Sequence, residues 1–388
     1  MYFGYHEIGL ALDSHDCVVL DSRRPGVVEE RRMPALAEVR GKDVVAIGRR
    51  AYKLVGKSKE IVRIFPGRLE DPIVLGGYLE KVIPKTLSLA RRRVWASVPT
   101  AASLQLQLNL LNCLDHYLHA KEIVLVPDLL AAAVGVGLPV LAGEESSHRA
   151  RMIVHVSGTR IAAGVFVDGS LVGLTDREGS WDRVVREIQE TIQFCLGATM
   201  GYNTFFKLVR RLSRTFFERQ NGHTGARTSP AGEPTREGES NLEPLNGAAL
   251  EPSGTSNLRS FNDRGLIEYV IEDENISRAI DYQLKTILLS LEKVIFGCFA
   301  QLRNSGRGEI ANDLFADRIV VGGDLYFDPH ALSRHLTRLT RFPFEAAPGN
   351  PVPRGLRTIL TATKAQKQGY RAIARAIHDA ERLHQSRL

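Results

Sequence analysis

Three stretches decide the fold: RRRVWASVPT at residues 91–100, KEIVLVPDLLAAAVGVGLPV at residues 121–140, and RMIVHVSGTRIAAGVFVDGSLV at residues 151–172. The first two contain apolar runs that predict buried strands at 94–98 and 123–126. The second run leads into an alanine-rich helix from Leu129. The third stretch predicts a β-hairpin, with strands at 152–157 and 161–167 around a turn at Ser157-Gly158-Thr159. Strands that alternate with helices are typical of an α/β domain.

The alternation continues in both directions from these stretches. Further strands are predicted at 8–13, 17–22, 43–48, 170–175 and 318–323. Apolar residues three and four positions apart predict helices. These lie at 49–55, 73–89, 104–118, 182–196, 204–217 and 330–339. Asn275 is the predicted N-cap of a longer helix whose apolar face runs from Ile276 to Leu302.

The composition is that of an ordinary globular protein, with 388 residues, 44% hydrophobic and 24% charged. This length is sufficient for two or more domains. No apolar run approaches the ~20 residues that span a bilayer, and no secretory leader is visible. The four cysteines lie far apart in apolar segments, which predicts buried free thiols. We therefore expect a cytoplasmic protein.

The net charge of +7 favours acidic partners only weakly, because the basic residues occur in short local runs. The sequence has no zinc-type Cys/His spacing, no P-loop and no RNA-binding signature. We therefore expect no nucleic-acid partner.

Two segments differ in character from the rest of the chain. Residues 219–263 are rich in Gly, Pro, Ser, Thr, Asn and Glu, which predicts a disordered insert or long loop. Residues 363–388 predict a basic amphipathic helix. Its apolar positions are Tyr370, Ile373, Ile377, Ala380 and His384. Two interpretations remain open for this helix: it packs on the body of the protein, or it binds a membrane surface or a partner.

Four segments in this order resemble MreB, the bacterial actin homologue that supports cell shape. VVAIGRRAYKLVGKSKEIVRIFP at 44–66 resembles part of the small subdomain of that family. The stretches at 91–100 and 121–140 resemble its "VPSG" strand and its "EEPMAAAIGAGLP" helix. The stretch at 151–172 resembles its second phosphate hairpin, and RIVVGGDLYF at 318–327 resembles its adenosine-side turn.

The resemblance implies an actin-like fold of class α/β, with two β-sheet domains and flanking helices around a nucleotide cleft. Domain I would span residues 1–151 and include a small subdomain at about 30–68. Domain II would span residues 152–340, with the insert at 219–263. Residues 341–362 would return to domain I, and residues 363–388 would form the C-terminal helix.

The family binds ATP, and its first phosphate hairpin, "IDLGTANT", lies without gaps over LALDSHDC at residues 10–17. The metal-organising aspartate becomes Ala11, and a glycine becomes Asp13. Asp13 is therefore the candidate Mg²⁺ ligand, since two carboxylates that face a triphosphate need a cation between them. The other candidate nucleotide-binding residues of this turn are Ser14, His15 and Asp16. The alternative interpretation is a purely structural turn.

In the second hairpin the family's "DIGGGT" becomes HVSGT, so that a catalytic-side aspartate is replaced by His155. Gly158 and Thr159 still offer a backbone N–H and a hydroxyl to a phosphate. His155 itself is interpreted as a structural residue.

Asp128 occupies the position of the family's water-positioning glutamate, and is one methylene shorter. It is the candidate catalytic base, with an N-cap role as the alternative. On the adenosine side the candidate binding residues are Gly322, Gly323, Asp324 and Leu325. The acidic pair expected to reach the ribose falls near Tyr202 and Asn203, which carry no charge.

The resemblance implies an MreB-like cytoskeletal or scaffold protein, involved in cell shape or intracellular organisation. It would form actin-like filaments or dock on them, with weak or absent binding and hydrolysis of Mg²⁺ and ATP. The partners would be further copies, an MreB-type filament, or the inner membrane surface, reached through the N-terminus or the C-terminal helix. The alternatives are an active filament-forming ATPase, and a small-molecule kinase or chaperone-type ATPase of the same superfold.

Overall fold

The computed structural model describes residues 6–12, 16–24, 27–54, 60–64, 71–83, 92–144, 149–178, 181–196, 202–223, 263–323 and 328–385. Some of the predictions concern residues outside these ranges. They are the predictions for residues 1–3, Asp13, Ser14, His15, Asp324 and Leu325, and for most of the insert.

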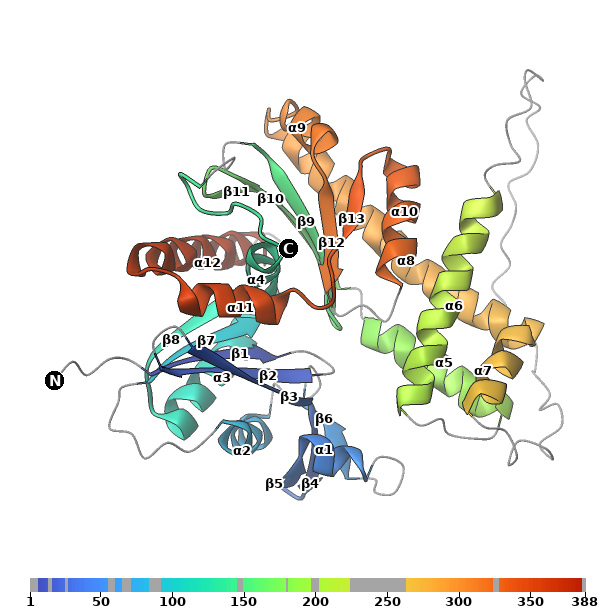
Figure 1. Ribbon diagram of the computed structural model, residues 1–388, viewed down its shortest axis with the longest axis horizontal. Helices are drawn as coiled ribbons and strands as arrows, with labels where there is room; N and C mark the ends of the chain where they lie inside the picture. Colours follow the sequence, from blue (N-terminus) through green and yellow to red (C-terminus); the bar gives the residue numbers. More distant parts are fainter. Residues whose placement is uncertain are drawn as a thin grey trace.

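The N-terminal part of the chain forms a five-stranded sheet with the order β3-β2-β1-β7-β8. The strands are β1 (His6–Leu12), β2 (Asp16–Arg24), β3 (Val27–Pro34), β7 (Arg92–Val98) and β8 (Ala120–Pro127). Pairing is antiparallel from β1 to β3 and parallel from β1 to β8. Helices α2 (Pro72–Val82) and α3 (Leu104–Leu118) cover one face of this sheet (Figure 1).

A small three-stranded sheet with the order β5-β4-β6 lies beside this larger sheet. It consists of β4 (Leu36–Arg40), β5 (Asp43–Ile47) and β6 (Ile61–Arg63), and it carries the short helix α1 (Gly48–Tyr52). These elements fall within the small subdomain predicted at residues 30–68.

The C-terminal part of the chain forms a second five-stranded sheet, with the order β11-β10-β9-β12-β13. The strands are β9 (Arg151–Val156), β10 (Arg160–Val167), β11 (Ser170–Glu178), β12 (Ile319–Gly323) and β13 (Phe344–Ala346). The associated helices are α5 (Trp181–Leu196), α6 (Tyr202–His223), α7 (Asp263–Glu272), α8 (Glu274–Asn304), α9 (Ile310–Ala316) and α10 (Pro329–Thr340). The long helix α8 buries Ile280, Leu284 and Leu291 in the core of this half.

The two large sheets repeat one strand order. In each sheet three strands form an antiparallel meander. Two further strands then extend the sheet by parallel pairing. The strand β9 thus takes the place of β1, and β12 takes the place of β7. This repetition gives the two similar halves that the sequence predicts for an actin-like fold.

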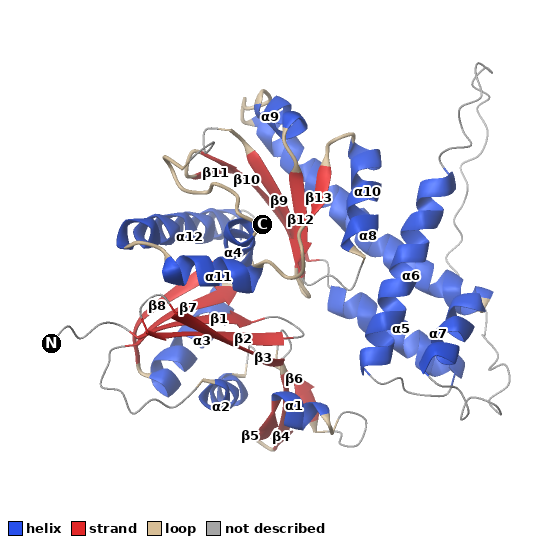
Figure 2. Ribbon diagram, viewed as in Figure 1, coloured by secondary structure: helices blue, strands red, loops and turns tan. Residues whose placement is uncertain are grey.

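Three helices lie between the two large sheets: α4 (Asp128–Gly135), α11 (Val352–Thr361) and α12 (Lys364–Gln385) (Figures 1 and 2). One apolar cluster joins them to both sheets. It includes Leu20 and Trp95 from the first sheet, and Ile153 and Phe166 from the second. The two halves therefore share a continuous core.

The C-terminal helix α12 packs on the body, which was one of the two interpretations of its sequence. Tyr370, Ile373 and Ile377 are buried in the shared cluster, whereas Ala380, predicted to lie on the same face, is exposed. Since this apolar face is covered by the protein, it is not available to a membrane surface.

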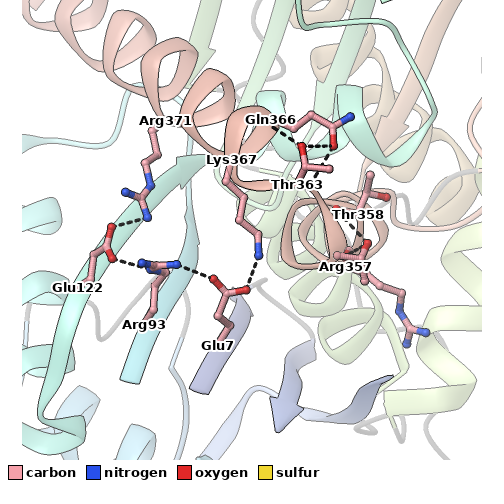
Figure 3. Close-up of polar contacts among 10 residues, drawn as sticks. Glu7, Arg93, Glu122, Arg357, Thr358, Thr363, Gln366, Lys367 and Arg371 are labelled. Carbon is pink, nitrogen blue, oxygen red and sulfur yellow. Dashed lines mark hydrogen bonds and ion pairs between the residues drawn. The ribbon is translucent and has the colours of Figure 1, made fainter. Parts of the chain in front are cut away.

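Ion pairs along the edge of α12 fix it to three adjacent strands (Figure 3). Glu7 on β1 accepts hydrogen bonds from Lys367 and from Arg93 on β7. Glu122 on β8 pairs with Arg93 and with Arg371, whose guanidinium also lies 5.1 Å from the ring centroid of Trp95. Because each acid has two basic partners, the network holds α12 in one register on the sheet.

We expect Ile377→Ala to lower the free energy of unfolding by about 2–4 kcal/mol, because the side chain is fully buried between the halves. The matched control is Arg375→Ala on the same helix, which is exposed and should change stability by less than about 0.5 kcal/mol. Urea denaturation of both variants measures this. Equal effects of the two substitutions would show that α12 does not contribute its apolar face to the core.

Several sequence predictions need correction. Helix α6 continues to His223, so the insert does not begin at residue 219. Asp273, rather than Asn275, caps α8, because its carboxylate accepts hydrogen bonds from the N–H groups of Asn275 and Ile276. The exposed edge strand β3 was not predicted.

The four cysteines are free, as predicted, but only Cys17, Cys113 and Cys298 are buried, whereas Cys195 is half-buried. Burial raises the pKa of Cys17 to about 12. Among the helices that the structure describes, none combines the length and hydrophobicity needed to cross a bilayer.

Candidate functional site

The candidate site is built where three strand ends meet. Thr100 follows β7, Asp128 follows β8 as the first residue of α4, and His155 is the penultimate residue of β9. The first two strands belong to one large sheet and β9 to the other. A chain of polar contacts among these residues therefore links the two halves.

The carboxylate of Asp128 is held mainly by Thr100. The backbone N–H of Thr100 donates to Oδ1 at 2.8 Å, and the Thr100 hydroxyl donates to the same oxygen. The Thr100 hydroxyl oxygen also accepts a hydrogen bond from the N–H of Leu129 at 3.1 Å. The alternative role of Asp128 as an N-cap is wrong, because Pro127 occupies that position and Asp128 is the first residue of the helix.

The other oxygen of Asp128 faces His155. Nε2 of His155 lies 3.4 Å from Oδ2, and both residues are buried. Burial alone would raise the pKa of Asp128, but the charge and hydrogen bond of His155 and the two donors of Thr100 outweigh burial and lower it. Asp128 is therefore an ionised carboxylate in a buried setting. Of its about four acceptor positions, three are directed at protein donors.

The turn between β9 and β10 is closed by its own residues. The N–H of Ser157 donates to the carbonyl oxygen of Arg160 at 2.8 Å, and the N–H of Arg160 donates to Ser157 Oγ at 3.1 Å. Arg160 is further fixed by an ion pair with Asp176 on β11. Gly158 and Thr159, between these two anchors, make no hydrogen bond to any other described residue. The turn thus presents free donors at the end of β9.

The two glycines on the adenosine side have a structural explanation of their own. Gly322 and Gly323 pair with His155 and Val156 in the β12–β9 ladder. A Cβ atom at Gly323 would lie 2.0 Å from the carbonyl oxygen of Val156, and one at Gly322 would lie 2.8 Å from Ala347 Cβ. Close packing of protein on protein therefore requires both glycines, and their contact with a nucleotide stays a prediction.

The first turn contributes only its two ends to the described residues. Leu12, at the end of β1, donates its N–H to Ser97 Oγ at 3.0 Å. Asp16 begins β2 opposite Pro34, and Ala11 is buried. The structure does not describe Asp13, Ser14 and His15 between these ends. Their roles stay predictions.

A family model described as MreB/Mbl protein matches residues 5–226, which is more than half of the chain. The chain belongs to the MreB/Mbl family. No curated protein matches the sequence.

Three solved structures show the same fold as this MreB/Mbl protein. It resembles MreB5 of Spiroplasma citri bound to ADP, with 14% identity and a TM-score of 0.60, over 92% of this chain and 96% of that one. The AMPPNP-bound form of MreB5 gives 15% identity and a TM-score of 0.61, over 94% and 97%. A MamK double helical filament gives 14% identity and a TM-score of 0.53, over 91% and 97%. At these identities the likeness shows an actin-like fold and nothing finer.

The described part of the site in this MreB/Mbl protein contains hydrogen-bond donors that a phosphate could use. The free donors at Gly158 and Thr159 suit a phosphate oxygen. Among the residues that the structure describes, however, no three His, Cys, Asp or Glu side chains gather in a group that could hold a metal. Asp13 as a metal ligand stays a prediction, because the structure does not describe this residue.

The sequence singled out Asp128, Gly158 and Thr159 as candidate site residues, and their roles stay predictions. It did not indicate Thr100. The only signal was a hydroxyl residue two positions after a strand, in the sequence Val98-Pro99-Thr100. The sequence also treated His155 as a separate structural residue, whereas the structure brings it to the carboxylate of Asp128.

Proposed function

We propose that this protein is an MreB-type filament subunit that binds an adenine nucleotide between its two halves and hydrolyses it slowly or not at all. Membership of the MreB/Mbl family supports filament formation by this protein, as does the likeness to a MamK double helical filament. The likeness to MreB5 bound to ADP and to AMPPNP supports nucleotide binding. The described residues form two five-stranded sheets with the same strand order.

One observation supports slow hydrolysis: the carboxylate of Asp128 is already engaged. Oδ1 accepts two hydrogen bonds from Thr100, and Oδ2 faces His155. A base that activates water needs an oxygen free to accept the proton at hydrogen-bond distance. Asp128 is also one methylene shorter than the glutamate of the family, and a displacement of about 1 Å can cost roughly a hundredfold in rate.

The cellular role belongs to the same proposal. The protein would organise cell shape or the cell interior from the cytoplasm, as copies of itself or together with an MreB-type filament. Contact with the inner face of the membrane would then fall to residues 1–3, because α12 buries its apolar residues in the shared core.

We expect wild-type protein to bind ATP and ADP in calorimetry and to pellet as filaments with either nucleotide. Asp128→Asn keeps the size of the side chain and removes its charge. Phosphate release should be the same for the wild type and this variant, and electron microscopy of the pellets would show whether they contain filaments.

Two results would contradict this proposal in different ways. Phosphate release by the wild type that falls by about a hundredfold or more in Asp128→Asn would make Asp128 a general base and the protein an active ATPase. The position of Asp128 at the start of α4 and its lowered pKa favour that alternative. If the wild type neither bound nucleotide nor pelleted, the proposed function itself would be wrong.

A further inference from the structure

His155 contains a buried polar atom that no described residue satisfies. The residue is 3% exposed, and its Nε2 lies 3.4 Å from Asp128. Its Nδ1 has no hydrogen-bond partner among the residues that the structure describes. A buried nitrogen without a partner is unfavourable, and a bound ligand can supply the missing hydrogen bond.

The alternation of side chains along β9 places His155 on the face of the sheet that meets the other half. Met152, Val154 and Val156 belong to the core of the C-terminal half, whereas Ile153 belongs to the cluster shared by both halves. His155 lies on the same face as Ile153, since residues two apart share a face of a strand. Its ring is therefore directed towards α4, where Nε2 faces Asp128.

The neighbours of His155 along the chain and across the sheet offer further contacts to a ligand. The turn with the free donors of Gly158 and Thr159 begins two residues later. Gly322 lies directly opposite His155 in the β12–β9 ladder. Donors of this kind, gathered at the end of one strand, are suited to an anion.

The protonation of the ring follows from its partner. Because the carboxylate of Asp128 is ionised and can only accept, Nε2 carries a hydrogen. Nδ1 here acts as a donor only when both ring nitrogens carry hydrogen, and an oxyanion at Nδ1 would give this second N–H an acceptor. In that form Nδ1 is a donor, and its bond to an oxyanion is charge-assisted.

We propose that Nδ1 of His155 donates a hydrogen bond to a phosphoryl oxygen of the bound nucleotide. The inference rests on the nucleotide binding in the proposed function and names the residue that recognises the phosphates. Asp128 then serves as a positioning residue, which holds the ring through Nε2.

The experiment compares two variants that each keep one nitrogen. The side-chain amide of His155→Gln reaches the place of Nε2 and removes the donor at Nδ1, whereas that of His155→Asn lies near Nδ1. We expect His155→Gln to weaken ADP binding on the order of tenfold to a hundredfold, and His155→Asn to weaken it by less. The affinity for adenosine, which has no phosphate, should stay unchanged in both.

The matched control is His335→Gln, which changes another buried histidine, in α10 beside Phe217. It should leave the affinity for ADP unchanged. Calorimetry with ADP and with adenosine at one fixed Mg²⁺ concentration gives all of these values. A wild type that binds ADP, with the same affinity in His155→Gln, would overturn this inference and leave the proposed function standing. Equal losses of ADP and adenosine binding would also overturn it.

A second measurement needs no variant that must fold. In wild-type protein with ¹⁵N-labelled histidine, an imidazole Nδ1 resonance should shift when ADP is added and stay in place when adenosine is added. Absence of such a shift at saturating ADP would overturn the inference. Absence of any ADP binding to the wild type would overturn the nucleotide part of the proposed function together with it.

Discussion

Replacing Gly355 with alanine is expected to lower the free energy of unfolding by more than about 4 kcal/mol, which is an exceptional cost for one methyl group. Gly355 lies in α11 where this helix crosses α4. A Cβ atom at this position would lie 1.7 Å from the carbonyl oxygen of Ala131 and 3.0 Å from the nitrogen of Gly135. Both atoms belong to the backbone of α4, so no change of side-chain rotamer relieves the overlap.

The same crossing is tight from the other side. A Cβ atom at Gly135 would lie 2.0 Å from the carbonyl oxygen of Pro351. The two glycines thus let α4 and α11 touch backbone to backbone at the centre of the molecule. Separating the helices to admit a methyl group would open the cluster that joins the two sheets. The cost therefore extends well beyond the local overlap.

Gly308→Ala provides the matched control for this prediction. Its Cβ position has no atom within 4 Å, and its φ is not in the left-handed region. Since alanine also restricts the unfolded chain, this variant should be neutral or stabilised by up to about 1 kcal/mol. Urea denaturation of both variants is the measurement. A Gly355→Ala protein within about 1 kcal/mol of the wild type would show that the crossing adjusts freely.

The sequence predicts best those elements whose ends and faces carry local signals. The helix predicted at 104–118 has these same limits in the structure. Ser103 caps its first turn by accepting a hydrogen bond from the N–H of Leu106 at 3.2 Å, and His119 ends it in the left-handed conformation. Leu110 and Leu114 then face the core at helical spacing. Each of these signals lies within about four residues of the place where it acts.

Elements that depend on a distant partner were not predicted. Strand β3 has the sequence VVEERRMP, is largely exposed and shows no alternation, so only its pairing with β2 makes it a strand. The last turn of α6 has the polar sequence of the insert that follows it, and composition therefore assigned residues 219–223 to that insert.

Some features of the site could likewise be predicted from the sequence and others could not. The sequence shows the residue types at Asp128 and His155 and the altered hairpin. The contact between them requires that β8 and β9, from different sheets, end at the same place. The role of Thr100 likewise depends on the parallel pairing of β7 with β8. A sequence offers candidates of this kind but not the distances between them.

Asp128→Ala is the second change with a large expected effect, a loss of about 3–5 kcal/mol of stability. The substitution leaves the N–H and the hydroxyl of Thr100 without their acceptor. It also leaves His155 buried with neither nitrogen paired among the described residues. The matched control is Asp128→Asn, whose amide oxygen can still accept from Thr100, and which should cost only about 1 kcal/mol. Equal effects of the two variants would contradict a role for these hydrogen bonds.

The pH dependence of this stability follows from the lowered pKa of Asp128. In the unfolded chain the carboxyl group titrates near its ordinary value of about 3.9. The stability gained from the ionised group is therefore complete above this pH, and it is lost as the pH falls through the lower pKa of the folded state. The difference in unfolding free energy between the wild type and Asp128→Asn should thus shrink from pH 5 to pH 3. Urea denaturation at both values measures it, and a difference that grows as the pH falls would mean that Asp128 is protonated in the folded protein and donates to its neighbours.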